Sequence, residues 1–295
     1  MSSLPAARGW QARLSLGFEA GPARTRLAHR EHSGPLLVQR PFHPEPAAEG
    51  RYCEPCHAYL IHPPGGVASG DELTLEATVG ARAHALLTTP AAAKFYRRAA
   101  AGRARVRQQL EVAGGALEWL PQENIFYPDA DVELATVARL SGQACLIGWE
   151  IGCLGLPERG EAIGSGTLRL SLEIWRDAQP LLLERLNLDA AVLAARWGLG
   201  GHVAFGTALA YPAGERELEL ARAALAGRTD GGGCGDAGDD CAERLLACTL
   251  IDGVLVCRAT ARRTDRLRQR FVEWWQALRP QILARQAVAP RIWAT

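Results

Sequence analysis

The chain has 295 residues, with 33 basic and 32 acidic side chains and a formal net charge of +1. This balance excludes a broad electrostatic surface for nucleic acid or for an anionic membrane, so we expect proteins or small species as partners. The N-terminal stretch lacks a cationic segment followed by an apolar run, and no run of about 18 apolar residues occurs anywhere. We therefore expect a cytoplasmic protein.

Short segments with alternating or continuous apolar residues recur along the chain and end near Gly, Pro, Asp or Asn. Such segments are typical of strands, and they are too brief for most helices. Many strands at roughly 10-residue spacing favour an all-β sandwich, barrel or β-solenoid, and the residues alone leave these three open. The segments are 12–18, 57–62, 72–79, 104–112, 131–140, 167–175, 180–186 and 253–259.

Helical periodicity is clearest near the C-terminus, in residues 264–286. Thr264 or Asp265 can cap its start, and Pro280 should break it, leaving a short continuation. Its apolar face should pack on the β body. A second, shorter helical candidate is 187–198, with Gly198 as its stop. The apolar positions of the C-terminal segment are Leu267, Phe271, Trp274, Trp275, Leu278 and Ile282.

The Gly- and Asp-rich stretch 227–243 is predicted to be a flexible, solvated loop. Its four aspartates suggest a site for a hard cation as the alternative, but their spacing does not fit an EF-hand. They are Asp230, Asp236, Asp239 and Asp240.

Cys53, Cys56 and His57 follow the C-x-x-C-H spacing by which c-type haem is attached. That attachment belongs to exported proteins, and the chain shows no export signal, so we expect no haem. A structural zinc site would need a second Cys or His pair at short spacing. In a reducing compartment most of the eight cysteines should be free thiols.

Residues 57–97 hold the densest polar constellation of the chain, interleaved with apolar strand positions. Carboxylates and imidazoles together suit a borderline divalent metal such as Ni²⁺, bound weakly. The structural alternatives are that Asp71 is a turn residue and His84 a hydrogen-bonded core histidine. The members are His57, His62, Asp71, Glu72, His84, Thr88, Thr89, Lys94, Tyr96 and Arg97, and Lys94 is the only lysine of the chain.

Six ordered motifs spanning nearly the whole chain resemble the UreD family of urease accessory proteins, also called UreH. They are CHAYLIHPPGGVASGDELTL (56–75), AHALLTTPAAAKFYR (83–97), LEWLPQENIFYPDADVEL (117–134), GWEIGCLGLPERGE (148–161), ERLNL (184–188) and APRIWAT (289–295).

The resemblance implies a single domain over 1–295, mainly β, with strands coiled into a solenoid-like body and few helices. It implies a urease maturation factor rather than an enzyme. Such a scaffold binds urease apoprotein and UreF, and through UreF the GTPase UreG. The resemblance also implies that it holds no tight cofactor. Ni²⁺ is expected to pass transiently by a hydrated internal route, and GTP is expected to be used by the partner GTPase.

Five residues are expected along that nickel route. The motifs carry over Asp71 and Glu72 from GDEL, Glu150 from GWEI, and Lys94 from KFYR as a residue near the route. His62 of HPPGG is added from its chemistry, because a neutral imidazole binds nickel.

Two positions depart from the family pattern. Ala93 stands where relatives often carry a hydroxyl, and Leu156 stands where an arginine is common. Two alternative functions remain. One is a pure scaffold with no metal conduit. The other is a metal-dependent hydrolase, which would need a positioned general base and lacks any accompanying hydrolase motif.

Overall fold

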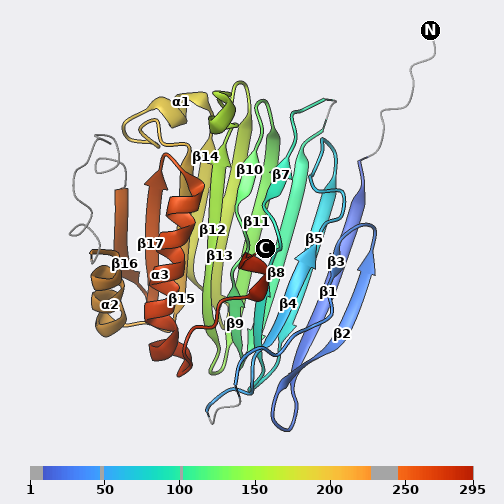
Figure 1. Ribbon diagram of the computed structural model, residues 1–295, viewed down its shortest axis with the longest axis vertical. Coiled ribbons are helices and arrows are strands. Elements are labelled where there is room, and N and C mark those ends of the chain that lie inside the picture. The colour runs from blue at the N-terminus through green and yellow to red at the C-terminus, as the bar shows by residue number, and fades with distance from the viewer. Residues whose placement is uncertain (1–8, 47–49, 100–101, 227–244, 295) are drawn as a thin grey trace.

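Two β-sheets face each other in the computed structural model, and helices cover the outer face of one of them (Figure 1). The structure describes residues 9–46, 50–99, 102–226 and 245–294. The predicted loop at 227–243 and its aspartates lie outside the described residues.

The described residues form a seven-stranded and a ten-stranded sheet. In the first, the order is β14 (Gln179–Leu188), β13 (Thr167–Arg176), β11 (Asp131–Ser141), β8 (Ala104–Ala113), β5 (Glu72–Val79), β1 (Gln11–Ala20) and β2 (Thr25–Ser33). In the second, it is β16 (Leu245–Ile251), β17 (Val254–Ala261), β15 (Ala204–Tyr211), β12 (Cys145–Leu154), β9 (Ala116–Trp119), β6 (His84–Thr88), β4 (Cys56–Ile61) and β3 (Leu37–Val38), with β10 (Asn124–Phe126) joining β12 to β7 (Ala93–Phe95).

From β4 to β13 the chain passes back and forth between the two sheets, and the strands of successive turns are parallel. The pairs that involve β2, β3, β14, β15, β16 and β17 are antiparallel. β5, β8, β11 and β13 pair in parallel on one side, and β4, β6, β9 and β12 on the other. This is a β-solenoid of about four turns. The expected mainly β, solenoid-like fold is confirmed, and each of the eight predicted strand segments lies on a strand.

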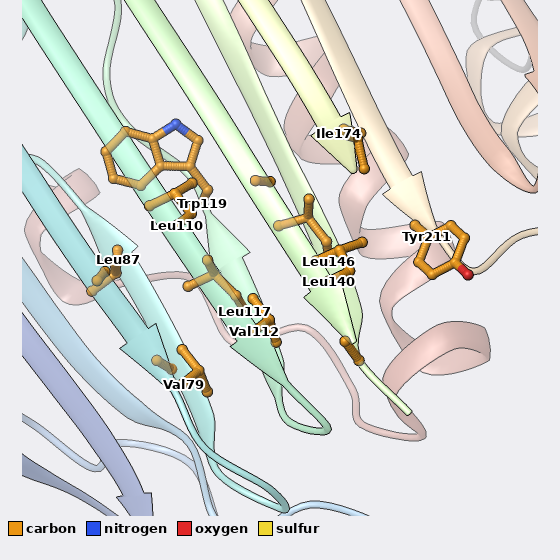
Figure 2. Packing of buried hydrophobic residues seen from close by; sticks show 14 of the residues in the cluster. Val79, Leu87, Leu110, Val112, Leu117, Trp119, Leu140, Leu146, Ile174 and Tyr211 are labelled. Carbon is orange, nitrogen blue, oxygen red and sulfur yellow. The ribbon is translucent and has the colours of Figure 1, made fainter. Parts of the chain in front are cut away.

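The main core lies between the sheets and is built from residues in matching positions on successive turns. Val79, Val112 and Leu140 are paired partners on β5, β8 and β11. Leu117 and Leu146 pair on the opposite sheet, and Figure 2 shows these side chains gathered in the interior. Each such burial contributes roughly 1.5–3 kcal/mol, so the solenoid is stabilised turn by turn.

A second apolar layer joins the ten-stranded sheet to α2 (Glu215–Ala226) and α3 (Thr264–Leu283) (Figure 1). α3 packs on β12, β15 and β17. Its predicted apolar face is confirmed: five of the six predicted residues are buried and Ile282 is partly buried. No helix of the described residues is long and apolar enough to cross a membrane.

The predicted ends of α3 were wrong in two respects. Its N-cap residue is Arg263, which makes no side-chain cap, and the Asp265 carboxylate instead accepts hydrogen bonds from that guanidinium at 3.0 Å. The helix also continues through Pro280 to Leu283 without a break. Arg279 is fully buried among ion-pair partners, and Leu278 and Leu283 are buried beside it, so their packing holds the turn that Pro280 weakens.

The candidate helix at 187–198 is shorter than predicted, and α2 was not predicted. Asn187 and Leu188 belong to β14, and Asp189 caps only the five-residue α1 (Ala190–Ala194). The remaining short helices are η1 (Pro157–Arg159) and η2 (Arg291–Ala294). In α2, buried Leu218, Ala221 and Leu225 at helical spacing were the signal that could have found it.

Candidate functional site

A cavity of about 560 Å³ lies between the two sheets. Apolar residues form most of its wall, as expected for the interior of a two-sheet body. The polar side chains that line it are His62, Thr89, Lys94, Gln108, Gln122, Asn124 and Glu150.

The cavity reaches the surface between two loops of the solenoid. One loop follows β4 and contributes Pro63 and Gly65, and the other joins β6 to β7 and contributes Ala91. These residues and Lys94 at β7 are exposed. The loops after β4 and β6 therefore form a mouth through which solvent and small solutes reach the interior.

Glu150 lies at the inner end of the cavity, on β12. Both faces of this strand are covered: Trp149 and Ile151 pack toward α3, and Glu150 points between the sheets. Gly148 and Gly152 flank it on the inward face. A Cβ at Gly152 would lie 2.3 Å from the Phe205 ring, and one at Gly148 would lie 2.8 Å from the Trp119 carbonyl oxygen, so the glycines let these neighbours approach the strand on either side of Glu150.

The surroundings of Glu150 favour its protonated form. Burial raises the pKa of Glu150 to about 7, the Thr136 hydrogen bond opposes this, and the Glu184 carboxylate raises it further. The Thr136 hydroxyl contacts Glu150 and also lies 2.6 Å from Gln108 Oε1. Because a hydroxyl has one proton, a protonated Glu150 can donate to Thr136 while Thr136 donates to Gln108.

A second, smaller cavity of about 40 Å³ continues beyond Glu150. The two cavities share Asn124 and Glu150, and the smaller one is also lined by Glu184 and Thr207. Its volume exceeds the roughly 10–15 Å³ that one water molecule needs. Glu150 thus lies where the two cavities adjoin.

Glu184 was not singled out from the sequence, although it begins the ERLNL motif. It accepts hydrogen bonds from Thr207 at 2.7 Å and from Arg258 Nε at 2.6 Å, and Arg258 is exposed. Glu184 shares the inward face of β14 with Leu182 and Leu186. An acidic residue at the same alternate positions of the strand as the inward-facing leucines was the signal that could have identified Glu184.

Three of the five expected residues line the large cavity: His62 and Lys94 near its mouth, and Glu150 at its inner end. Burial lowers the pKa of His62, and the Asp71 carboxylate partly opposes that shift. His62 is therefore neutral at pH 7 and has a ring nitrogen available as a ligand. Lys94 is exposed at the rim.

Asp71 and Glu72 do not line the cavity. The Asp71 carboxylate accepts the backbone N–H groups of Trp10 at 2.8 Å and Ala68 at 2.7 Å, which makes it the turn residue considered above. Glu72 is on the outer face of β5 and accepts a hydrogen bond from Arg105 at 3.1 Å. Strand alternation places neighbouring Leu73 on the cavity side instead.

Two other members of the polar constellation belong to a different layer. His57 and His84 are fully buried, and their Nε2 atoms lie 2.9 Å from Glu45 and 2.7 Å from Glu118, respectively. Arg279 of α3 joins the two carboxylates. His84 is thus a hydrogen-bonded core histidine, and these groups hold α3 to the ten-stranded sheet.

The C-x-x-C-H residues point into separate environments. The Cys53 thiol lies 3.6 Å from the Gly21 carbonyl, burial raises the pKa of Cys56 to about 12, and His57 pairs with Glu45. All six cysteines in the described part of the chain are free thiols, as expected. No group of three or more His, Cys, Asp or Glu side chains among the described residues could hold a metal ion.

Of the two positions that depart from the family pattern, one lines the cavity and the other does not. Ala93 lines it and offers no hydroxyl there. Leu156 forms an isolated bridge with Glu161 next to η1 and does not line the cavity.

Comparisons with known proteins find a matching family model and similar sequences. A family model described as UreD urease accessory protein matches residues 11–294. The chain is similar to the urease accessory protein UreD of Klebsiella aerogenes, with 42% identity over 295 residues and 99% of each chain covered. It is also similar to UreD of Citrobacter koseri (40% over 289 residues, 98% and 93% covered) and of Alcanivorax borkumensis (41% over 294 residues, 98% and 93% covered).

Proposed function

Because this chain belongs to the UreD family of urease accessory proteins, non-catalytic factors that assemble the nickel centre, we propose that its interior cavities form a hydrated route for Ni²⁺ toward urease. Family membership implies association with urease and its accessory proteins. We further propose that the partners are urease apoprotein and UreF, with the GTPase UreG bound through UreF.

The position of Glu150 carries the proposal. It lines both cavities and is the one carboxylate they share. On one side the space opens at the loops beside His62 and Lys94, and on the other it reaches Glu184, which pairs with exposed Arg258. A cation entering at one end therefore meets side-chain oxygens before it reaches the other end.

The chemistry of these side chains suits passage rather than storage. Ni²⁺ accepts imidazole nitrogen, carboxylate oxygen and water, and sites with few protein ligands bind it weakly. Glu150 and Glu184 are close enough for the charge of one to raise the pKa of the other, and a divalent cation would relieve that repulsion. The Lys94 ammonium at the mouth disfavours a resident cation there.

The five expected residues thus take different roles in the proposal. His62 and Glu150 are ligands along the route, Lys94 is a charge at its mouth, and Asp71 holds the turn at residues 68–71, outside the route. Glu72 remains outside the route because its side chain faces Arg105 on the outer surface.

Co-expression with urease and its accessory proteins tests the route. The double variant Glu150→Gln/Glu184→Gln keeps the shapes of both side chains and removes both carboxyl groups. We expect it to bind urease and UreF in pull-downs and to yield urease with most of its nickel missing by metal analysis. The matched control is Glu72→Gln/Glu76→Gln, which removes two charges from the outer face of β5 and should leave nickel loading unchanged.

The outcomes separate a conduit from a scaffold. Full nickel loading with the interior double variant would overturn the route. Loss of partner binding together with nickel would favour a pure scaffold, in which the interior carboxylates only support the fold. A third outcome, nickel loss in the outer-face control alone, would move the route to the surface of the seven-stranded sheet.

A further inference from the structure

The hairpin of β16 and β17 places two cysteines opposite each other at one end of the ten-stranded sheet. Its turn has two residues, Asp252 and Gly253, with φ of +46° and +78°, the left-handed values that a type I′ hairpin turn requires. Ile251 and Val254 flank the turn, and Cys248 is the direct partner of Cys257.

The position of this pair in the ladder follows from the turn. In a two-residue hairpin the flanking pair exchanges both backbone hydrogen bonds, and bonded and non-bonded pairs alternate from there. Cys248 and Cys257 are three pairs further along, so they form a non-hydrogen-bonded pair. Cα atoms in such pairs lie about 4.5 Å apart, which is within the roughly 4.4–6.8 Å range that a disulfide spans.

The two thiols differ in accessibility and in charge environment. Cys257 is fully buried, whereas Cys248 is half-buried. The Arg222 guanidinium of α2 lies at Cys248 and donates to its carbonyl at 3.2 Å. The Cys257 hydrogen bond lowers the pKa of Cys248, and Arg222 lowers it further against the effect of burial.

The indole N–H group of Trp274, on α3, is a further donor near Cys248. The indole nitrogen is buried and has no hydrogen-bond partner among the described residues, and it lies beside the Cys248 sulfur. A thiolate at Cys248 would therefore be stabilised by the Arg222 guanidinium, the Cys257 S–H group and the Trp274 N–H group. The other buried cysteines differ: burial raises the pKa of Cys153 to about 11 and that of Cys56 to about 12.

We propose that Cys248 and Cys257 form a redox site that a peroxide oxidises to a cross-strand disulfide. The Cys248 thiolate attacks a peroxide oxygen, the O–O bond breaks, and a sulfenic acid forms as hydroxide leaves. Cys257 loses its proton, its sulfur attacks the Cys248 sulfur, and the S–O bond breaks as water leaves. Two thiols and one hydrogen peroxide thus give one disulfide and two waters.

The experiment treats the full-length chain with hydrogen peroxide and maps its cysteines by mass spectrometry of unreduced peptides. We expect a Cys248–Cys257 cross-link that is two hydrogen masses lighter than the reduced pair. We also expect Cys248 in the untreated chain to react with iodoacetamide roughly tenfold or more faster than Cys153, since the thiolate is the nucleophile.

Variants separate the two chemical steps. Cys257→Ser should stop the reaction at a Cys248 sulfenic acid that dimedone traps, and Cys248→Ser should leave Cys257 unmodified. The matched control Cys153→Ser should retain the cross-link. An absence of the Cys248–Cys257 peptide, a cross-link of Cys248 to a different cysteine, or equal reactivity of Cys248 and Cys153 would each overturn the proposal.

Discussion

Two carboxyl groups on neighbouring strands face opposite sides of the ten-stranded sheet: Glu118 of β9, which is fully buried, and Glu150 of β12, which is half-buried. The pKa of Glu118 is lowered, whereas that of Glu150 is raised. Glu118 faces α3, where Arg279 Nε lies 2.9 Å away and Trp275 Nε1 donates at 2.6 Å. Glu150 faces the cavities, where Thr136 contacts it and no cation pairs with it among the described residues.

The difference shows that burial alone does not set the charge of a carboxyl group. Burial raises both pKa values, but at Glu118 the Arg279 charge and the His84 hydrogen bond outweigh it and hold the pKa well below its usual range. At Glu150 only the Thr136 hydrogen bond opposes burial, and the pKa rises. One layer therefore uses its carboxylate as a structural ion, and the other holds a carboxyl group whose protonated form is favoured.

The largest expected effect comes from breaking the paired layer. Arg279→Met keeps the aliphatic stem and leaves Glu118 and Glu45 buried without their cation. Removing one partner of a buried ion pair costs about 3–5 kcal/mol, so we expect a loss of unfolding free energy of that order in urea titrations. Arg266→Met, an exposed position on the same helix, should change it by less than about 0.5 kcal/mol. Equal losses in both variants would contradict the role assigned to Arg279.

The second prediction concerns the unpaired layer and pH. The folded-state pKa of Glu150, about 7, lies above its ordinary value of 4.5, so its stabilising effect is present below pH 4.5 and is lost as pH rises through 7. Glu150→Gln in nickel-free buffer should remove this loss of stability. The free energy of unfolding of the variant should exceed that of the parent protein by up to about 3 kcal/mol at pH 8 and by much less at pH 5.

Urea titrations at both pH values measure this difference. Glu219→Gln on the exposed face of α2 is the matched control and should show no pH-dependent gain. A Glu150→Gln variant equally stabilised at both pH values would contradict the protonation of Glu150.

A smaller effect is expected from one donor of the paired layer. Trp275→Phe removes the N–H group that donates to Glu118 while keeping most of the aromatic packing. Hydrogen bonds to charged groups contribute about 1.5–3 kcal/mol, so a loss near the lower end is expected because Arg279 still pairs with Glu118. Thermal unfolding compared with Trp293→Phe, which loses a bond to the neutral Thr88 hydroxyl, tests whether the charged acceptor matters.

The smallest effect is expected where a carboxylate is solvated. Glu72→Gln removes an ion pair with Arg105 in which both side chains are more than a third exposed. Such pairs contribute about 0–1 kcal/mol, and salt screens them. Urea titrations at low and high salt should show a small loss that disappears at high salt. A loss comparable to that of Arg279→Met would mean that Glu72 is part of a buried network.

The sequence predicted three residues that line one cavity and two that do not. Glu150, His62 and Lys94 were predicted together and meet in one cavity, whereas adjacent Asp71 and Glu72 differ from them because strand alternation and a turn direct their carboxylates elsewhere. Glu184 was missed because it comes from a strand 34 residues further along than Glu150, and only the closure of the two sheets brings it near.

By itself the sequence determined the strand positions, the apolar face of the C-terminal helix and the free state of the described cysteines, because these depend on local periodicity and composition. Tertiary structure decided the parallel coiling, the end of α3 beyond Pro280, and the states of Glu118 and Glu150. Both glutamates are single acidic residues in apolar strands. Whether Arg279, 161 residues away from Glu118, arrives beside one of them is set by the docking of a helix and not by any neighbouring residue.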